Sequence, residues 1–216
     1  SHQHNHFAAV ISPGADEEHG EVFAVNLVYS GNFHAEAEVD AFGLVRLGIG
    51  LNPFDFCWML APGESFQTPE AVLVYSNEGI GGMSRIYHRL YRNRLCRGVH
   101  RDKERPILVN NWEATYFNFT ADKIEAIAET GSQLGIELLV LDDGWFGKRD
   151  SDNSSLGDWV EDRRKLPNGL RDLAERIVRQ GLQFGLWFEP EMISPDSDLY
   201  RKHPDWCLHA EGRRRT

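Results

Sequence analysis

Two neighbouring carboxylates, Asp142 and Asp143, follow an apolar stretch and precede a glycine and a tryptophan, Gly144 and Trp145. Ionised carboxylates accept hydrogen bonds strongly from hydroxyl groups, and an indole ring packs well against C–H groups. A sugar presents both kinds of surface, so this combination of residues favours carbohydrate recognition. A helix-capping or loop role for the two acids remains the alternative on spacing alone.

The acid pair lies at the end of a predicted strand. Residues 138–141 are apolar on both faces, which is typical of a parallel sheet covered by helices. Such sheets collect ligand-binding groups at the carboxyl ends of their strands. Two further apolar stretches, 106–109 and 184–188, also run into polar groups, and each is accompanied by a tryptophan, Trp112 or Trp187. Core packing is the alternative for Trp187, since it lies within the apolar stretch.

Helical patterns separate these strands and suggest consecutive βα units. Thr120 is predicted to cap the first helix, and the second, with Leu173 and Val178 facing inward, is predicted to end at Gly181. Such units form either a doubly wound sheet or a (β/α)8 barrel. Ligand-type residues at all three strand ends favour the barrel, in which every strand points at one shared site. A complete barrel takes roughly 250 residues, so we expect the later units beyond Thr216.

The pattern is different before residue 83. Short β-branched and aromatic segments at 21–30 and 70–76, separated by turn-like sequences, predict the end of a β-sandwich. Apolar residues from Met83 onwards recur at helical spacing. The fold class predicted is therefore an α/β multidomain fragment, with the last part of a β-sandwich at 1–82, a linking helix and linker at 83–104, and the first three βα units of a (β/α)8 TIM barrel at 105–216.

Composition excludes several classes of protein. Asp and Glu number 33 against 23 Lys and Arg, so the net charge disfavours nucleic-acid binding. No apolar stretch is long enough to span a bilayer, so no membrane partner is expected. Three cysteines, Cys57, Cys96 and Cys207, form no CxxC pair, which argues against a disulfide framework or a zinc site and favours a reducing compartment.

No resident metal or nucleotide is predicted. His2, His4 and His6 alternate, but they lack the carboxylate or cysteine company of a metal site, so a polar strand edge is the favoured interpretation. The glycine-rich residues 48–55 do not have the spacing of a dinucleotide-binding loop, and none of the three predicted strands is followed by one. A dinucleotide-dependent oxidoreductase is therefore disfavoured.

Longer motifs carry a resemblance that the spacing alone does not. The chain resembles the bacterial α-galactosidases of glycoside hydrolase family 36, the melibiase and raffinose-degrading type, over most of its length. The motifs that carry this resemblance are NNWEA at 110–114, LDDGWFG at 141–147, LGDW at 156–159 and WFEPEM at 187–192, with NPF at 52–54 and PGESF at 62–66 upstream.

This resemblance implies hydrolysis of terminal α-linked galactose from oligosaccharides, with retention of anomeric configuration and without a cofactor. It implies that Asp142 and Asp143 bind galactose hydroxyls and that Trp112 and Trp187 form walls of the galactose pocket. Glu189 and Glu191 are expected to support the site. The resemblance further implies a bacterial protein, which we expect to be cytoplasmic and homo-oligomeric.

The reactive groups themselves are expected elsewhere. Retaining hydrolysis needs a carboxylate nucleophile and an acid/base about 5 to 5.5 Å apart, and the family places both on later barrel strands. Asp142 and Asp143 are adjacent at one strand end, so they cannot readily flank a glycosidic bond from opposite faces. We therefore assign no catalytic residue to this chain and expect it to be inactive in isolation. A non-catalytic carbohydrate-binding or scaffold protein is the alternative. For the complete enzyme, we expect Asp143→Asn to reduce catalytic efficiency strongly and to leave thermal stability nearly unchanged.

Overall fold

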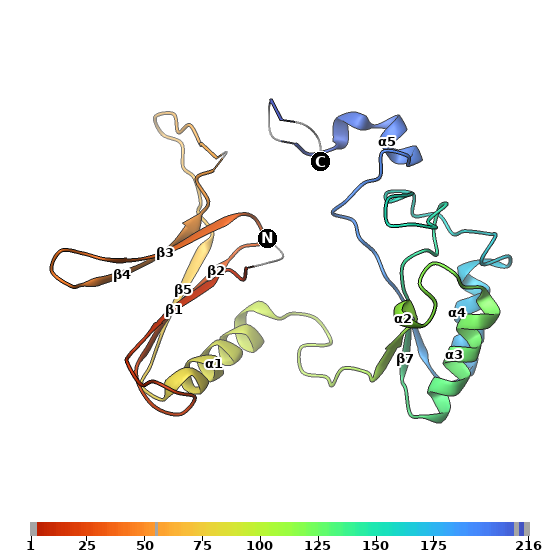
Figure 1. Cartoon of the computed structure of the whole chain (residues 1–216), viewed down its shortest axis with the longest axis horizontal. Helices are drawn as coiled ribbons and strands as arrows, with labels where there is room; N and C mark the ends of the chain where they lie inside the picture. Colours follow the sequence, from red (N-terminus) through yellow and green to blue (C-terminus); the bar gives the residue numbers. More distant parts are fainter. Residues whose placement is uncertain (1–3, 55, 210–211, 214–216) are drawn as a thin grey trace. The chain divides into compact units, whose positions relative to one another are not determined.

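The computed structural model describes residues 4–54, 56–209 and 212–213. The chain forms two compact units, Ser1–Lys103 and Glu104–Thr216, each of which is described by itself. Figure 1 colours them from red to blue along the sequence. The domain limits expected from the sequence, at residues 82 and 104, stay a prediction.

The first unit contains two antiparallel sheets. One has the order β1-β2-β5, and the other is the hairpin β3-β4, which closes through Asp40–Leu44. Polar turn residues and alternating apolar residues produce these strands. The β1-β2-β5 sheet has one buried face, whereas the described residues of β3 and β4 are partly or fully exposed. The strands are β1 (Phe7–Ile11), β2 (Val22–Val28), β3 (Phe33–Val39), β4 (Val45–Leu51) and β5 (Glu70–Ser76).

Helix α1 (Gly79–Leu90) packs on the β1-β2-β5 sheet and continues into a π-helical turn, η1 (Tyr91–Leu95). Val22 is fully buried on the face under the helix, whereas its neighbour Phe23 is exposed on the other face. Tyr87 of α1 is buried and donates a hydrogen bond to the carbonyl of Val72, 3.2 Å away. The helix expected as a linker is thus part of the core of the first unit.

The second unit contains a parallel sheet with three strands in chain order. Its strands are β6 (Leu108–Asn110), β7 (Leu138–Leu141) and β8 (Gln183–Leu186), with β7 in the middle. The helices that follow the strands are α2 (Trp112–Thr115), α3 (Ala121–Gln133), α4 (Gly169–Arg179) and α5 (Asp198–Lys202), followed by a short 3-10 turn, η2 (Pro204–Trp206).

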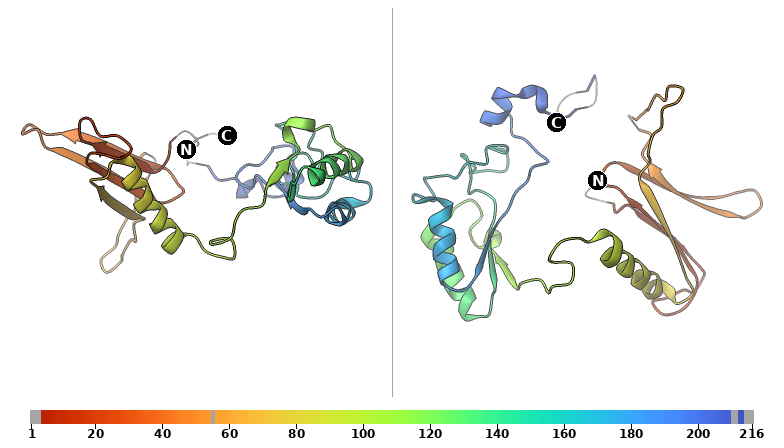
Figure 2. Two further views of the ribbon diagram at one scale, coloured as in Figure 1. Left: turned by 90° about the horizontal axis from the view of Figure 1, so that it is seen from below. Right: turned by 180° about the vertical axis from the view of Figure 1, so that it is seen from behind.

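Helices α3 and α4 cover the same face of this sheet, as Figures 1 and 2 show from three directions. Leu139 and Leu141 of β7 are fully buried against them, whereas Leu138 and Val140 on the opposite face are only partly buried. Helices on one face and strands paired in chain order match the beginning of a (β/α)8 barrel, in which all helices lie outside. A doubly wound sheet has helices on both faces. The predicted fold class is confirmed.

The helix ends follow the predicted signals. The Thr120 hydroxyl accepts a hydrogen bond from the Lys123 amide at the start of α3. Gly135 follows α3 and Gly181 follows α4, both with positive φ, as expected of glycines that end helices. No helix within the described residues is long and apolar enough to cross a membrane.

Two details of the prediction are wrong. Val178, expected to face inward, is 57% exposed, because it lies about 100° around the helix from the fully buried Ile177. The stretch 106–109, predicted to be an apolar strand of a sheet covered by helices, leaves Ile107 60% and Leu108 52% exposed. The reason is that β6 pairs only with β7 among the described strands and is therefore an edge of this sheet.

Candidate functional site

The residues predicted to recognise sugar all follow the carboxyl ends of β6, β7 and β8. Trp112 follows β6 by two residues, Asp142 and Asp143 follow β7 directly, and Trp187 follows β8 directly. The Trp187 amide donates to the Leu141 carbonyl, 2.9 Å away, so the backbone of Trp187 lies beside the start of the acid pair. All four residues therefore lie at the carboxyl end of the parallel sheet.

Asn110 connects two of these residues across neighbouring strands. Its side-chain oxygen accepts a hydrogen bond from the Trp112 amide at 2.7 Å, and its side-chain nitrogen donates to Oδ2 of Asp142. The other carboxylate oxygen of Asp142 accepts the Asp143 amide at 2.6 Å. One amide side chain thus fixes the start of α2 and the orientation of the first acid.

Asn111 holds the backbone at the same point. Its side chain is fully buried, with Oδ1 accepting the Asp142 amide at 2.8 Å and Nδ2 donating to the Thr115 hydroxyl at 2.8 Å. An unpaired amide would be costly at this depth, so both polar atoms find partners. Asn110 and Asn111 were not assigned roles from the sequence, although they lie within the NNWEA motif.

The two acids have different surroundings. Continuing the alternation of β7, Asp142 follows the partly exposed face of Leu138 and Val140, whereas Asp143 follows the buried face of Leu139 and Leu141. Asp143 is 5% exposed. Its carboxylate forms a two-pronged ion pair with Arg149, with Nη2 2.7 Å from Oδ2 and Nε 2.9 Å from Oδ1. Sequence analysis missed Arg149, because a basic residue in a polar loop carries no periodic signal of burial.

The two tryptophans differ as well. Trp112 is half-buried, and its ring meets Tyr116 and Phe117 edge to face, with centroid separations of 5.2 and 5.0 Å. Trp187 is partly buried against the hydrophobic core of the second unit, and its carbonyl accepts the Trp145 indole N–H at 3.0 Å. Both tryptophans are thus partly exposed, with Trp112 packed on two aromatic neighbours and Trp187 on the core.

The loop that follows β7 is packed rather than merely polar. Trp145 and Phe146 are buried in the core, and Trp145, Trp159 and Phe188 make ring contacts with one another. Asp158 of the LGDW motif accepts the amides of Asp198 and Leu199 at 2.9 and 3.1 Å and so caps α5. The loop from β7 to α4 and the segment after β8 therefore hold each other in place.

Glu189 lies near the acid pair after β8. Partial burial raises the pKa of its carboxyl above the ordinary value, and the negative charges of Glu191, Asp143 and Asp152 raise the pKa further against the opposing effect of Arg149. Glu191 is exposed. This environment is consistent with the supporting role expected for Glu189, which stays a prediction.

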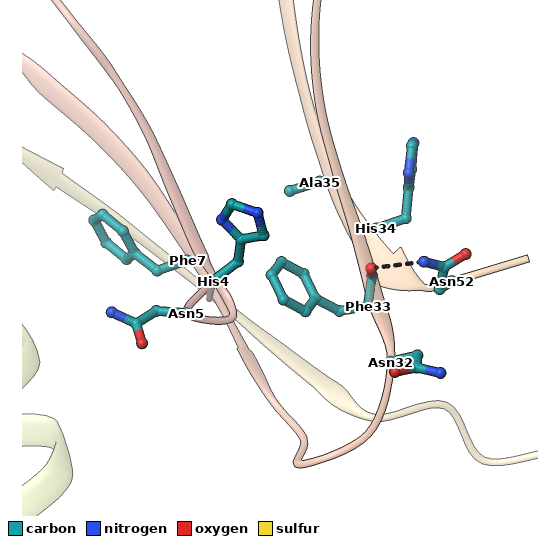
Figure 3. A pocket seen from close by; sticks show the side chains of 8 residues that line it. All are labelled: His4, Asn5, Phe7, Asn32, Phe33, His34, Ala35 and Asn52. Atoms are coloured by element: carbon teal, nitrogen blue, oxygen red, sulfur yellow. Dashed lines mark hydrogen bonds between the residues drawn. The ribbon is translucent and has the colours of Figure 1, made fainter. Parts of the chain in front are cut away.

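A cavity in the first unit has a different chemistry. Figure 3 shows this cavity of about 700 Å³, where the Asn52 side chain donates to the Phe33 carbonyl at 3.1 Å. It is lined by His4, Asn5, Phe7, Asn32, Phe33, His34, Ala35 and Asn52. These residues include no carboxylate. His2 lies outside the described residues, and within them no three His, Cys, Asp or Glu side chains are grouped to hold a metal.

Comparisons with known proteins agree over the whole chain. The sequence model of the family described as "Melibiase" matches residues 65–216, and that of the "Glycosyl hydrolase family 36 N-terminal domain" matches residues 1–61. Alpha-galactosidase AgaA of Geobacillus stearothermophilus is 64% identical over 216 residues, which are 100% of this chain and 30% of AgaA. Alpha-galactosidase C of Emericella nidulans is 48% identical over 227 residues, again 30% of its length. The chain thus spans about a third of these relatives.

Solved structures give the same picture. The crystal structure of AgaA superposes with a TM-score of 0.93, covering 98% of this chain and 30% of AgaA. The α-galactosidase of Lactobacillus brevis, 49% identical, also gives 0.93 and covers 100% of this chain and 29% of its own. Variants of AgaA have been crystallised with raffinose and with stachyose.

Proposed function

Because this chain belongs to the melibiase family, we propose that its complete protein is a retaining α-galactosidase of glycoside hydrolase family 36. The chain itself supplies the galactose-recognition part of the active site. The observation that carries this assignment is the arrangement at one sheet edge, where Asn110 joins the Trp112 amide to the Asp142 carboxylate. An aromatic surface and an oriented acceptor are thereby held together, as recognition of a sugar requires.

The proposed substrates are oligosaccharides with a terminal α-linked galactose. The complexes of AgaA variants with raffinose and stachyose support this class of substrate. Asp142 and Asp143 would accept hydrogen bonds from galactose hydroxyls, while Trp112 and Trp187 would contact its C–H faces. Glu189 would support the acid pair from its position after β8.

The same geometry argues against a catalytic role for the acid pair. Asp143 is committed to Arg149, and Asp142 is held by Asn110 and by the Asp143 amide. Both acids are neighbours at the end of a single strand, so they are not placed across a glycosidic bond from each other. The nucleophile and the acid/base, which must face each other across the glycosidic bond, are proposed to lie on barrel strands that follow residue 216. The chain alone is therefore proposed to be inactive.

The test is hydrolysis by the complete polypeptide. With 4-nitrophenyl α-galactoside we expect release of nitrophenol, and proton NMR of the first product should show α-galactose, the retained anomer. Activity on the α-glucoside with none on the α-galactoside would refute the substrate class. Galactose binding without hydrolysis of any galactoside would instead support the alternative, a non-catalytic carbohydrate-binding protein. Sequence beyond residue 216 lacking further strand-end acids would support that alternative too.

The assembly and location of the complete protein are also proposals. Family resemblance supports a homo-oligomer, which light scattering on the complete protein would test. Cys57, Cys96 and Cys207 are all free thiols in the structure, which supports a cytoplasmic location.

A further inference from the structure

Arg149 is a buried cation to which the proposed function assigns no role. It lies in the loop after β7, six residues beyond Asp143, and its side chain is 3% exposed. A buried charge is costly unless it is paired and hydrogen-bonded, so its contacts determine what it does there.

The guanidinium of Arg149 donates hydrogen bonds both to a carboxylate and to backbone carbonyls. Nε and Nη2 bind the Asp143 carboxylate, as described above, while Nη1 donates to the carbonyls of Asp152 at 2.6 Å and Ser154 at 2.9 Å. This planar set of N–H groups fits a carboxylate and two carbonyls at once. A lysine ammonium carries the same charge but lacks this fixed fork. The contact is therefore specific for arginine.

The backbone around the pair is fixed by a second cation. The Lys165 ammonium donates to the carbonyls of Gly144 and Arg149, both 2.9 Å away, and lies 3.0 Å from Asp150. Gly144 directly follows Asp143 along the chain. Lys165 therefore holds the backbone next to Asp143 and the backbone of Arg149 together. The orientation of the Asp143 carboxylate is then set by the side chain of Arg149.

The ion pair leaves Asp143 with an unused acceptor position. An ionised carboxylate offers about four acceptor positions. Arg149 makes one contact to Oδ1 and two to Oδ2, which leaves Oδ1 with a second lone pair. Binding to Arg149 and acceptance of a hydroxyl hydrogen are therefore compatible at Asp143.

We propose that Arg149 is a positioning residue that fixes the Asp143 carboxylate so that Oδ1 accepts one particular hydroxyl of the sugar. This inference rests on the proposed function. Arg149 itself touches no substrate and acts only through Asp143. Oriented groups need to be held within about half an ångström of their working geometry, and a displacement of 1 Å can reduce rates about 100-fold.

The experiment compares Arg149→Lys with the parent form of the complete protein, well below the thermal midpoints of both. The substrates are 4-nitrophenyl α-galactoside and its four monodeoxy derivatives. We expect Arg149→Lys to lower kcat/KM about 10- to 100-fold on the intact galactoside. The loss should shrink to less than about threefold on the one derivative that lacks the hydroxyl bound by Asp143, because that contact is already absent.

Arg176→Lys is the matched control. Arg176 also binds a carboxylate through Nε and Nη2, which both donate to Oε2 of Glu125, with Nε 3.0 Å away, but this pair joins α4 to α3 and involves no residue of the proposed site. It should leave the relative rates on the five substrates unchanged. If Arg149→Lys lowers activity equally on all five substrates, or not at all, the proposal is wrong.

A second variant tests the proposal if Arg149→Lys fails to fold. Asp143→Glu keeps the ion pair but moves the carboxylate, so it should show the same selective loss. If neither variant folds, the Arg149–Asp143 ion pair serves only to stabilise the fold, and the positioning role is refuted. A parent protein that is inactive on every α-galactoside would refute the proposed function itself, an outcome separate from all of these.

Discussion

At the scale of single residues, the two adjacent acids are not equivalent. Asp142 is partly exposed and held by a neutral amide, whereas Asp143 is buried and paired with Arg149. The alternation of a strand explains this difference, since successive side chains point to opposite faces. Mutations of the two acids should therefore have different consequences for stability.

Asp142→Asn should test recognition with little effect on folding. Replacing the carboxylate weakens a charge-assisted hydrogen bond of about 1.5–3 kcal/mol, which lowers kcat/KM on an α-galactoside roughly 10- to 100-fold. The thermal midpoint of the complete protein should change little because Asp142 has no ionic partner among the contacts described above. Asp122→Asn on α3, whose side chain is 89% exposed, is the matched control and should alter neither quantity. Unchanged kinetics of Asp142→Asn would contradict its role.

For Asp143→Asn, the structure changes the expectation drawn from the sequence. This substitution leaves the Arg149 charge buried without its partner, which costs about 3–5 kcal/mol. We therefore expect a clear loss of stability together with a loss of activity. A thermal midpoint equal to that of the parent protein would show that the ion pair contributes little.

Glu189 should make stability depend on pH. Its folded-state pKa is raised, chiefly by burial, so the folded state favours the neutral acid. The stabilising contribution of the neutral form is complete below the unfolded-state pKa and is lost as pH rises through the folded-state pKa. Glu189→Gln should therefore raise the thermal midpoint of the complete protein at pH 7 and change it little at pH 4. An equal shift at both pH values would exclude ionisation as the cause.

At the scale of elements, the strand ends and helix ends were largely predictable from the sequence, while the loop after β7 was not. Apolar runs and Thr120 have local signals of period or capping. Arg149 and Lys165 are buried because the folded path of this loop brings carbonyls and a carboxylate together around them. No pattern of neighbouring residues encodes such convergence. The inward-facing prediction for Val178 failed for a related reason, since the width of the buried helix face is set by its neighbours.

Gly144, which directly follows the acid pair, is a position where a side chain would be costly. Its φ is +95°, and an added Cβ would lie 3.1 Å from Phe117 and 3.3 Å from the Lys165 ammonium. Gly144→Ala should therefore cost more than the roughly 1–3 kcal/mol of backbone strain and should also lower kcat/KM. Gly135→Ala is the control, because its φ is +84° but the added Cβ meets no atom within 4 Å. It should lower the thermal midpoint alone. Equal effects of the two variants would contradict the role of Gly144.

At the scale of the whole molecule, the second unit has the order of elements of a barrel but leaves apolar side chains at its edges. Ile107 and Leu108 of the β6 region are exposed, as is Phe188 after β8. Unpaired strand edges and exposed apolar surface favour association. These surfaces are where we propose that further barrel units pack in the complete protein.

The isolated chain should therefore associate. In size-exclusion chromatography with light scattering, we expect the 216-residue chain to form oligomers or aggregates that bind a hydrophobic dye such as ANS. The complete polypeptide should elute as one defined species and bind little dye. A monomeric isolated chain with low dye binding would show that the two units are stable without further strands.

The contacts that organise the acid pair also have a consequence for the order of folding. Arg149 and Asp143 are six residues apart, and Lys165 reaches Gly144 over 21 residues. Closing such short loops costs little chain entropy, so local contacts of this kind form early. During synthesis from the N-terminus, these residues can settle while the strands after residue 216 are still unmade. In the proposed α-galactosidase, the residues proposed to recognise galactose would then be in place before the proposed catalytic carboxylates are synthesised.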